Sequence, residues 1–198
     1  MVNNYKAQSC NYKMSYNYNP ALLGVILNTL NPQKNERILD VGCNRGFYVK
    51  HIEDYTKMII GIDISPEVIK NAITKKVRIG DAENLDFEDN IFDKIYSLNT
   101  IEHLSDPKRF LSETVRVLKP GGTMLIIYPW EPIRGIQAIP AAIKNYKNPF
   151  MCRKIHLYKL TPSKVKNLSS GLFLKHIKSK FIFSSGCHYM TVFKKAGG

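Results

Sequence analysis

The sequence predicts an α/β protein built on a doubly wound, mainly parallel sheet. Short apolar runs of strand length alternate with amphipathic stretches, and two of these stretches open with the helix-start signals Ser65-Pro66 and Asp106-Pro107. Strands that alternate with helices in this way form βαβ units, whose crossovers are right-handed. Since the chain has 198 residues and 44% of them are hydrophobic, we expect a single domain, residues 1–198, around one core.

The first two thirds of the chain contain the parallel part of this pattern. Apolar runs predict strands at residues 37–41, 57–63, 77–81, 92–98 and 124–128. Amphipathic stretches predict helices at residues 47–55, 65–74 and 106–118. The run Lys119-Pro120-Gly121-Gly122 is expected to end the last of these helices.

The pattern changes after Trp130. Residues 131–160 contain several prolines and other loop breakers, together with a basic amphipathic stretch from Ile133 to Ile139. We expect them to form an insertion that acts as a lid over the carboxyl edge of the sheet, on the substrate side. A helix is predicted at 161–168, and two final strands at 173–183 and 188–194 are joined only by Ser184-Ser185-Gly186, so they should pair as an antiparallel hairpin.

The basic charge of the chain lies in its last third. The formal net charge is +13, but residues 1–131 carry equal numbers of basic and acidic side chains, and no acid follows Glu131. A one-sided basic segment attracts polyanions or anionic membrane surfaces. Lysines on ordinary solvated faces explain the same composition, and both interpretations stay open.

Several classes of protein are disfavoured. No run of 18 apolar residues predicts a membrane-spanning helix, and the polar amino end lacks the apolar core of a signal peptide. The four cysteines are scattered and form no CxxC pair, so the sequence indicates neither a metal site nor a disulfide framework. A reducing cytoplasm is the expected location.

Three features fall at the carboxyl ends of consecutive predicted strands, where open α/β sheets bind ligands. The segment Asp40-Val41-Gly42-Cys43-Asn44-Arg45-Gly46 links the first strand to a helix and allows close approach of a ligand. Asp63 ends the second strand, where a carboxylate accepts ribose hydroxyls. Asp81, beside Ala82, ends the third. Each feature alone is often a simple turn or cap, but together they predict a nucleotide site.

At these motifs the chain resembles the class I S-adenosylmethionine-dependent methyltransferases, in particular the methyltransferase type 11 group. The matching segments are ILDVGCNRGFY, GIDIS and the stretch from GDAENL to LKPGG. The resemblance runs from about Arg37 to Tyr128 and is weaker beyond. It implies a seven-stranded Rossmann-like sheet in the order 3-2-1-4-5-7-6 with strand 7 antiparallel, and S-adenosylmethionine as the cofactor.

The resemblance also implies which residues hold the cofactor. The turn would line its methionine part, Asp63 would hold the ribose, Asp81 and Ala82 would contact the adenine, and Asn99 would lie near the sulfonium. The full implied set is Asp40, Gly42, Asn44, Gly46, Asp63, Ile64, Asp81, Ala82 and Asn99.

The turn departs from the family pattern at one position. Asn44 stands where the family has its middle glycine, followed by Arg45. Asn tolerates positive φ better than other residues with a side chain, so the turn can survive. Arg45 either meets the cofactor carboxylate or faces solvent, and Tyr16 and Tyr18 either close over the cofactor or lie on the surface.

Methyl transfer from a sulfonium mainly requires that donor and acceptor be positioned and water excluded; a base is needed only for a poorly ionised acceptor. The candidate bases are His156, His103, Tyr128 and Glu131, of which His156 and then His103 are favoured. For His103, a hydrogen-bonding role at a helix start is an equal alternative. Asp93, at the opposite end of its strand, is expected to be structural.

The expected acceptor is a small or amphiphilic, lipid-like and anionic molecule, reached through residues 131–160. Peripheral membrane contact through the isoleucines of that segment, cover of an apolar acceptor and a plain core helix remain alternatives. An RNA methyltransferase that uses the basic last third is less favoured, because no added RNA-binding domain is present. A protein that binds the cofactor without catalysis is the other alternative.

Overall fold

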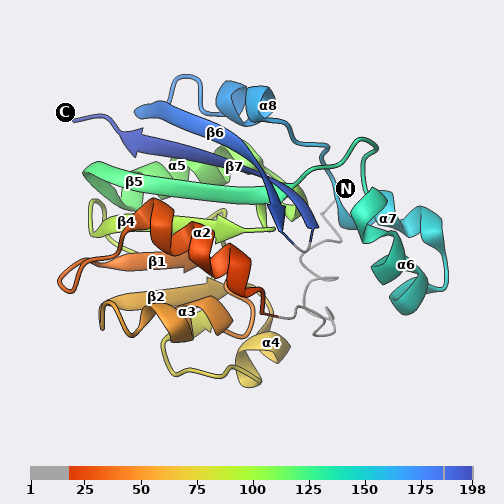
Figure 1. Ribbon diagram of the computed structural model, residues 1–198, viewed down its shortest axis with the longest axis horizontal. Helices are drawn as coiled ribbons and strands as arrows, with labels where there is room; N and C mark the ends of the chain where they lie inside the picture. The colour runs from red at the N-terminus through yellow and green to blue at the C-terminus, as the bar shows by residue number, and fades with distance from the viewer. Residues whose placement is uncertain (1–17, 185, 198) are drawn as a thin grey trace.

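The computed structural model describes residues 18–184 and 186–197, which form a single seven-stranded sheet flanked by helices (Figure 1). The helices of the first half are α2 (Pro20–Leu30), α3 (Phe47–Ile52), α4 (Pro66–Lys70), η1 (Ile101–His103) and α5 (Pro107–Val117). Those of the second half are η2 (Ile136–Ala138), α6 (Ile139–Tyr146), η3 (Pro149–Met151), α7 (Cys152–Ile155) and α8 (Pro162–Leu168). The strands are β1 (Ile38–Val41), β2 (Ile59–Asp63), β3 (Val77–Ile79), β4 (Phe92–Leu98), β5 (Leu118–Pro129), β6 (Leu174–Ser184) and β7 (Gly186–Lys195).

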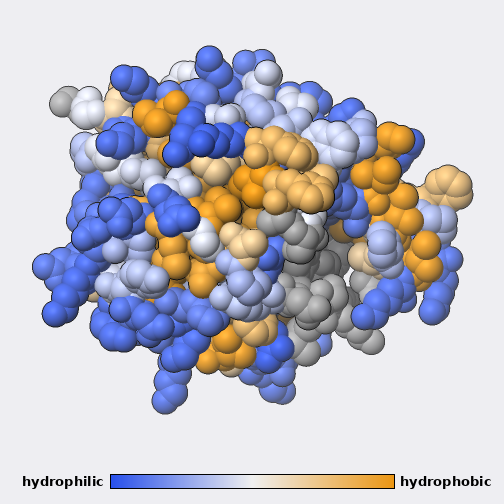
Figure 2. Space-filling view, in the orientation of Figure 1, coloured by the Kyte–Doolittle hydropathy of each residue, from blue (hydrophilic) through white to orange (hydrophobic). Residues whose placement is uncertain are grey.

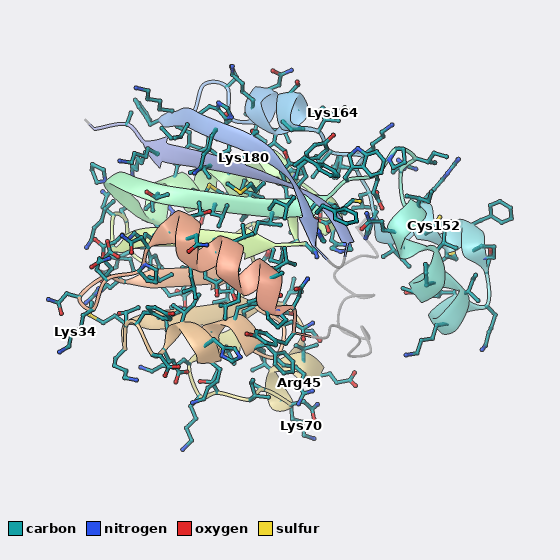
Figure 3. The ribbon with its side chains drawn as sticks, in the orientation of Figure 1. Lys34, Arg45, Lys70, Cys152, Lys164 and Lys180 are labelled. Atoms are coloured by element: carbon teal, nitrogen blue, oxygen red, sulfur yellow. The ribbon has the colours of Figure 1, made fainter. Side chains whose placement is uncertain are left out.

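The sheet order is β3-β2-β1-β4-β5-β7-β6, as the resemblance implies. Strands β1 to β5 are parallel, whereas β7 pairs antiparallel with both β5 and β6. The predicted hairpin is confirmed, with Ser184 opposite Gly186 at its tip. The edge strand β6 exposes Lys175, Lys178 and Lys180 (Lys180 is labelled in Figure 3). Lysines on an edge strand oppose pairing with another sheet, which gives part of the basic charge a structural reason.

Two helical layers cover the sheet, because successive side chains of a strand point to opposite faces. Leu125 and Ile127 of β5 pack in the cluster that contains α2 and α3. Their neighbours Met124 and Ile126 pack in the cluster that contains α5 and α8. Figure 1 shows α2 and α3 in front of the sheet and α5 behind it.

Helix α2 is not among the elements expected from the sequence. It begins at Asn19, whose side chain accepts hydrogen bonds from Ala21 N and Leu22 N, and its residues Leu22, Ile26 and Leu30 are buried against the sheet. The sequence does contain signals for this helix, namely the Asn-Pro start and the helical spacing of the apolar residues.

Strand β5 begins six residues earlier than expected. Leu118 pairs with Phe92, and the register of β4 and β5 then shifts before Lys94 pairs with Thr123. The Lys119–Gly122 run therefore forms an irregular part of the strand, and α5 already ends at Val117. The predicted helices at 47–55 and 65–74 are also shorter, since α3 ends at Ile52 and α4 at Lys70.

Gly42 sets the distance between the turn after β1 and the turn after β4. Its φ is +80°, and a Cβ atom at this position would lie 2.1 Å from Thr100 Oγ1. That hydroxyl is itself fixed, because it donates to the backbone oxygens of Val41 and Leu98. Only glycine fits here without moving the two turns apart.

We expect Gly42→Ala to destabilise the protein more than Gly121→Ala does. Both glycines have positive φ, +80° and +74°, but a Cβ at Gly121 meets no atom within 4 Å. Gly121→Ala should therefore cost only the backbone strain of about 1 kcal/mol, and Gly42→Ala about 1–3 kcal/mol more for the steric conflict. Urea unfolding of the two variants measures the difference, and equal losses would contradict the role given to Gly42.

Candidate functional site

A cavity of about 410 Å³ lies at the carboxyl ends of the parallel strands. It brings together ten of the eleven residues that the sequence predicts for the site: Asp40, Gly42, Asn44, Asp63, Ile64, Asp81, Ala82, Asn99, His103 and His156. Gly46 is the exception. Its φ is +80° at the start of α3, and its α-carbon faces the side chains of Thr74 and Val77, so the structure gives it a packing role outside the cavity lining.

Asp40 is a buried carboxyl group at the base of the cavity. It is 2% exposed, and its Oδ2 accepts a hydrogen bond from Tyr96 Oη at 2.8 Å. Burial raises the pKa of Asp40 to about 8, and the nearby Asp63 adds to this rise, whereas the bond from Tyr96 opposes it. Burial thus favours the neutral form of Asp40.

Asp63 connects the turn after β1 to the start of α4. Its Oδ2 accepts from Asn44 N at 2.9 Å, and its Oδ1 accepts from Ser65 N at 3.0 Å. Asn44 has φ +50°, so asparagine adopts the left-handed conformation that the family's glycine would take. Burial raises the pKa of Asp63, although its backbone hydrogen bonds oppose the rise. In the next turn, Asp81 Oδ1 accepts from Glu83 N at 2.9 Å.

Asn99 follows β4 and also has a left-handed backbone, with φ +51°. Its Nδ2 lies 3.5 Å from His188 Nε2 of β7. Its side-chain oxygen is buried and has no hydrogen-bond partner within residues 18–184 and 186–197. A buried amide oxygen without a donor is uncommon in proteins, and it suits a positively charged or hydrogen-bond-donating ligand.

The two histidines lie at the other side of the cavity, where η1 meets the end of α7. His156 Nδ1 is 2.8 Å from Glu131 Oε1, and His103 Nδ1 is 2.8 Å from the backbone oxygen of Ile155. Their rings meet edge to face with centroids 4.7 Å apart. Glu102 completes the group, with Oε1 3.7 Å from His103 Nε2.

These ionisable groups perturb one another. Burial lowers the pKa of His103 to about 3, and His156 adds to the effect. Burial raises the pKa of Glu102 to about 7, against the influence of His156. Burial also disfavours a charged His156, but the hydrogen bond to Glu131 and the two neighbouring carboxylates outweigh it and raise its pKa.

The remaining candidates lie elsewhere. Tyr128 is absent from the cavity lining, and its hydroxyl lies 2.9 Å from Thr191 Oγ1 inside the core. Asp93 accepts from Arg37 N and Lys119 Nζ and so joins the starts of β1, β4 and β5. Arg45 donates to the backbone oxygen of Asn71 at the end of α4, outside the cavity lining (Figure 3).

Of the two tyrosines expected near the cofactor, Tyr18 lines the cavity and stacks on His51, with ring centroids 4.4 Å apart. Tyr16 lies outside the described residues.

Sequence reasoning missed Glu102 and His188 as site residues and did not predict that Glu131 pairs with His156. Glu102 has a usable signal, because it follows the carboxyl end of β4 at the same edge as Asp63 and Asp81. His188 and the Glu131–His156 pair have no local signal, since their partners lie far away in the sequence.

Residues 131–160 form a small unit beyond the carboxyl end of β5 (Figure 1). Its own apolar cluster consists of Ala138, Ala142, Cys152 and Ile155. Three of the unit's helical segments face the cavity, because Gln137, Ala138, Ala141 and Ile155 are among the lining residues. Figure 2 shows apolar side chains gathered over α6 and α7. Within residues 131–160, the side chains of Ile133, Ile143 and Phe150 are exposed. Within the described ranges, no helix is long and apolar enough to cross a membrane.

Comparisons with known proteins identify a family that this chain resembles. Residues 39–126 match the family model described as "Methyltransferase domain". Ajmaline N-methyltransferase of Rauvolfia serpentina is 38% identical over 108 residues, which are 48% of this chain and 37% of the relative. The 2-methyl-6-phytyl-1,4-hydroquinone methyltransferase of Synechocystis is 37% identical over 112 residues, or 52% of this chain and 34% of that protein. The chain therefore spans about a third of the length of these curated relatives.

A structural comparison extends over nearly the whole chain. The geranyl diphosphate C-methyltransferase of Streptomyces coelicolor, solved with Mg²⁺, geranyl diphosphate and S-adenosyl-L-homocysteine, superposes with a TM-score of 0.75 at 12% identity. The match covers 98% of this chain and 99% of that one. At this identity the likeness shows a shared fold.

We expect the stability of the protein to depend on pH through Asp40. Its pKa is about 8 when folded and near 3.8 when unfolded, so the folded state binds one more proton between these values. The contribution is complete below about pH 4 and is lost as pH rises toward 8, with a slope of about 1.4 kcal/mol per pH unit for one group. Asp40→Asn keeps an acceptor for Tyr96 but does not titrate.

Urea unfolding of both proteins at pH 5, 6 and 7 measures this slope. The stability of Asp40→Asn should rise relative to that of the unsubstituted protein with each pH unit. A difference that stays constant over this range would contradict a neutral, buried Asp40.

Proposed function

Because this chain belongs to the class I S-adenosylmethionine-dependent methyltransferases, we propose that it transfers a methyl group to a small, amphiphilic acceptor bound beside residues 131–160. One observation carries the proposal. A single cavity joins the turn after β1, Asp63 and Ala82 on one side to His103 and His156 on the other. Donor and acceptor would then lie side by side, as direct transfer requires.

The donor side of the cavity fits the cofactor of this family. The carboxylate of Asp63 is held in place by two backbone N–H groups, and it would accept the ribose hydroxyls. Ala82 and Asp81 would border the adenine, while Gly42 and Asn44 would line the methionine part. Asn99 would face the sulfonium, since its buried amide oxygen has no partner among the described residues and favours a positive charge.

The chemistry asks little of the acceptor side beyond position. As the acceptor atom bonds to the methyl carbon, the carbon–sulfur bond breaks and its electron pair remains on sulfur, giving S-adenosylhomocysteine. The barrier is lowered when the acceptor atom is aligned with that bond and water is absent. We propose that His103, His156 and Glu102 contact the acceptor at this end, and that residues 131–160 act as a lid over it.

The lining supports a compact acceptor with both apolar and polar parts. Ala138, Ala141 and Ile155 offer apolar contacts next to the imidazoles of His156 and His103. Among the described lining residues none is Lys or Arg, so the expectation of an anionic acceptor finds no cationic side chain to support it. An alkaloid and a prenylated hydroquinone appear in the names of the two relatives, and both are small molecules.

The exposed isoleucines and Phe150 near α6 and α7 are consistent with brief contact with a membrane or with a lipid-like acceptor. The lysines of β6 lie on the edge of the sheet rather than in the cavity lining, so the nucleic-acid alternative gains no support from the site.

The test supplies purified protein and S-adenosylmethionine with a deuterated methyl group to a cell extract containing small molecules, RNA and protein. We expect the label in one or a few small molecules, detected by mass spectrometry, because the cavity of about 410 Å³ admits no folded polymer. Label found only in RNA or in protein would contradict the proposed acceptor class. Absence of any labelled product would contradict catalysis, and a matched reaction with Asp63→Ala controls for other enzymes in the extract.

A further inference from the structure

Glu102 is a buried carboxyl group whose two oxygens lack a partner among the described residues. Its side chain is 1% exposed, and neither carboxylate oxygen has a hydrogen-bond partner in the described part of the chain. The ring nitrogen His103 Nε2 lies 3.7 Å from Oε1, which is too long for a hydrogen bond. A buried carboxyl group without partners is unfavourable unless a cation or a donor satisfies it.

We propose that Glu102, His103 and His156 bind a divalent transition-metal ion, with Zn²⁺ as the reference, at the acceptor side of the cavity. Their ligand atoms lie within 4.8 Å of one another, and all three side chains are buried. Two imidazoles and one carboxylate form a donor set that suits zinc and its neighbours in the first transition row. All three residues line the cavity, so positions left open on the metal would face the acceptor.

The hydrogen bonds of the two histidines select the correct ring nitrogen for a metal. His103 Nδ1 can only donate to the backbone oxygen of Ile155, which places the lone pair of the neutral ring on Nε2. His156 Nδ1 faces the carboxylate of Glu131 at 2.8 Å, which likewise places the lone pair of the neutral His156 ring on Nε2. Metal-binding histidines in proteins are usually oriented in this way by a carbonyl or carboxylate behind them.

The distances require only a small contraction. Ligand atoms around a zinc ion lie about 3–3.5 Å apart, because each is about 2.0–2.2 Å from the metal. No two of the ligand atoms here are more than 4.8 Å apart, and the distance between His103 Nε2 and Glu102 Oε1 is 3.7 Å. The Glu102 carboxylate, whose oxygens make no hydrogen bond among the described residues, would rotate to shorten these distances.

The backbone around the site is already fixed on both sides. Leu157 N donates to the backbone oxygen of Glu102 at 2.9 Å, so η1 is attached to the chain just beyond α7. The three ligands thus come from segments more than fifty residues apart that are held together without the ion. The metal would join the residue 131–160 unit to the end of β4 still more tightly.

The ion also gives the cavity a positive charge. Its lining otherwise carries carboxylates and histidines but, among the described residues, neither Lys nor Arg. Resting on the proposed function, we infer that the open metal positions hold an oxygen of the acceptor, such as a hydroxyl, carboxylate or phosphate. An anionic acceptor is compatible with the cavity in this form.

The test is a titration of the EDTA-treated full chain with Co²⁺, a visible substitute for Zn²⁺, followed by competition with Zn²⁺. We expect one equivalent of Co²⁺ to give a visible absorption band that Zn²⁺ abolishes. Glu102→Gln should weaken Co²⁺ binding at least tenfold, since an amide is a poor ligand. The glutamine side chain is close in shape to the neutral carboxyl that burial favours, so the fold should survive. Glu131→Gln, behind His156, should weaken it about tenfold.

His176→Gln is the matched control, because His176 lies on β6 beside Ser179 and is absent from the cavity lining. It should leave Co²⁺ affinity unchanged. No Co²⁺ binding by the unsubstituted protein, or equal affinity in Glu102→Gln, would overturn the metal site. S-adenosylhomocysteine affinity, measured on the same samples, separates the two proposals. If the protein binds S-adenosylhomocysteine but no Co²⁺, the metal site is wrong and the proposed function stands. If it binds Co²⁺ but no S-adenosylhomocysteine, the proposed function is wrong and the metal site stands.

Discussion

The close approach of the Gly42 backbone to Thr100 is the contact on which the cavity depends. Because Gly42 has no side chain, the turn after β1 packs directly against the turn after β4. The same Thr100 hydroxyl binds the backbone of both strands. This contact brings the end of β4, with Asn99, toward the Asp40–Asn44 turn, so that residues from both strand ends line one cavity.

Carboxyl groups that are buried or half-buried are the second consequence of this geometry. Parallel strands end at a common edge, and the sequence places Asp40, Asp63 and Glu102 there. Two of them have hydrogen-bond partners: Asp40 accepts from Tyr96, and Asp63 accepts from two backbone N–H groups. Glu102 has no such partner among the described residues. Proteins keep such costly groups chiefly where a ligand offsets the cost, and this edge is where open α/β sheets bind ligands.

The sequence predicts the sheet and the donor side of the site well because their signals are local. Apolar runs, the Ser65-Pro66 and Asp106-Pro107 starts and the Gly42 turn each lie within a few residues, and the family resemblance supplies the strand order. The predicted start of β5 is wrong because the strand is extended by the pairing of Leu118 with Phe92, which is a tertiary contact. The packing role of Gly46 depends on Thr74 and Val77, which the chain brings back only after folding.

The acceptor side is harder to predict because it, too, depends on contacts between residues far apart in the sequence. His156 and Glu131 are 25 residues apart, and the carbonyl that orients His103 belongs to Ile155, 52 residues away. Such pairings depend on how residues 131–160 pack against η1, and no periodic pattern in the sequence predicts this packing. A histidine read from the sequence is thus a candidate, whereas its role depends on neighbours that only the fold supplies.

The most direct measurement of the central claim, that the strand-end cavity holds S-adenosylmethionine, is calorimetric binding of S-adenosylhomocysteine to the protein and to Asp63→Ala. Loss of hydrogen bonds to a charged group costs about 1.5–3 kcal/mol, so Asp63→Ala should weaken binding at least tenfold. Asp54→Ala, which removes an exposed aspartate outside the cavity lining, should leave it unchanged. Equal affinity for the protein and Asp63→Ala would contradict the placement of the cofactor in this cavity.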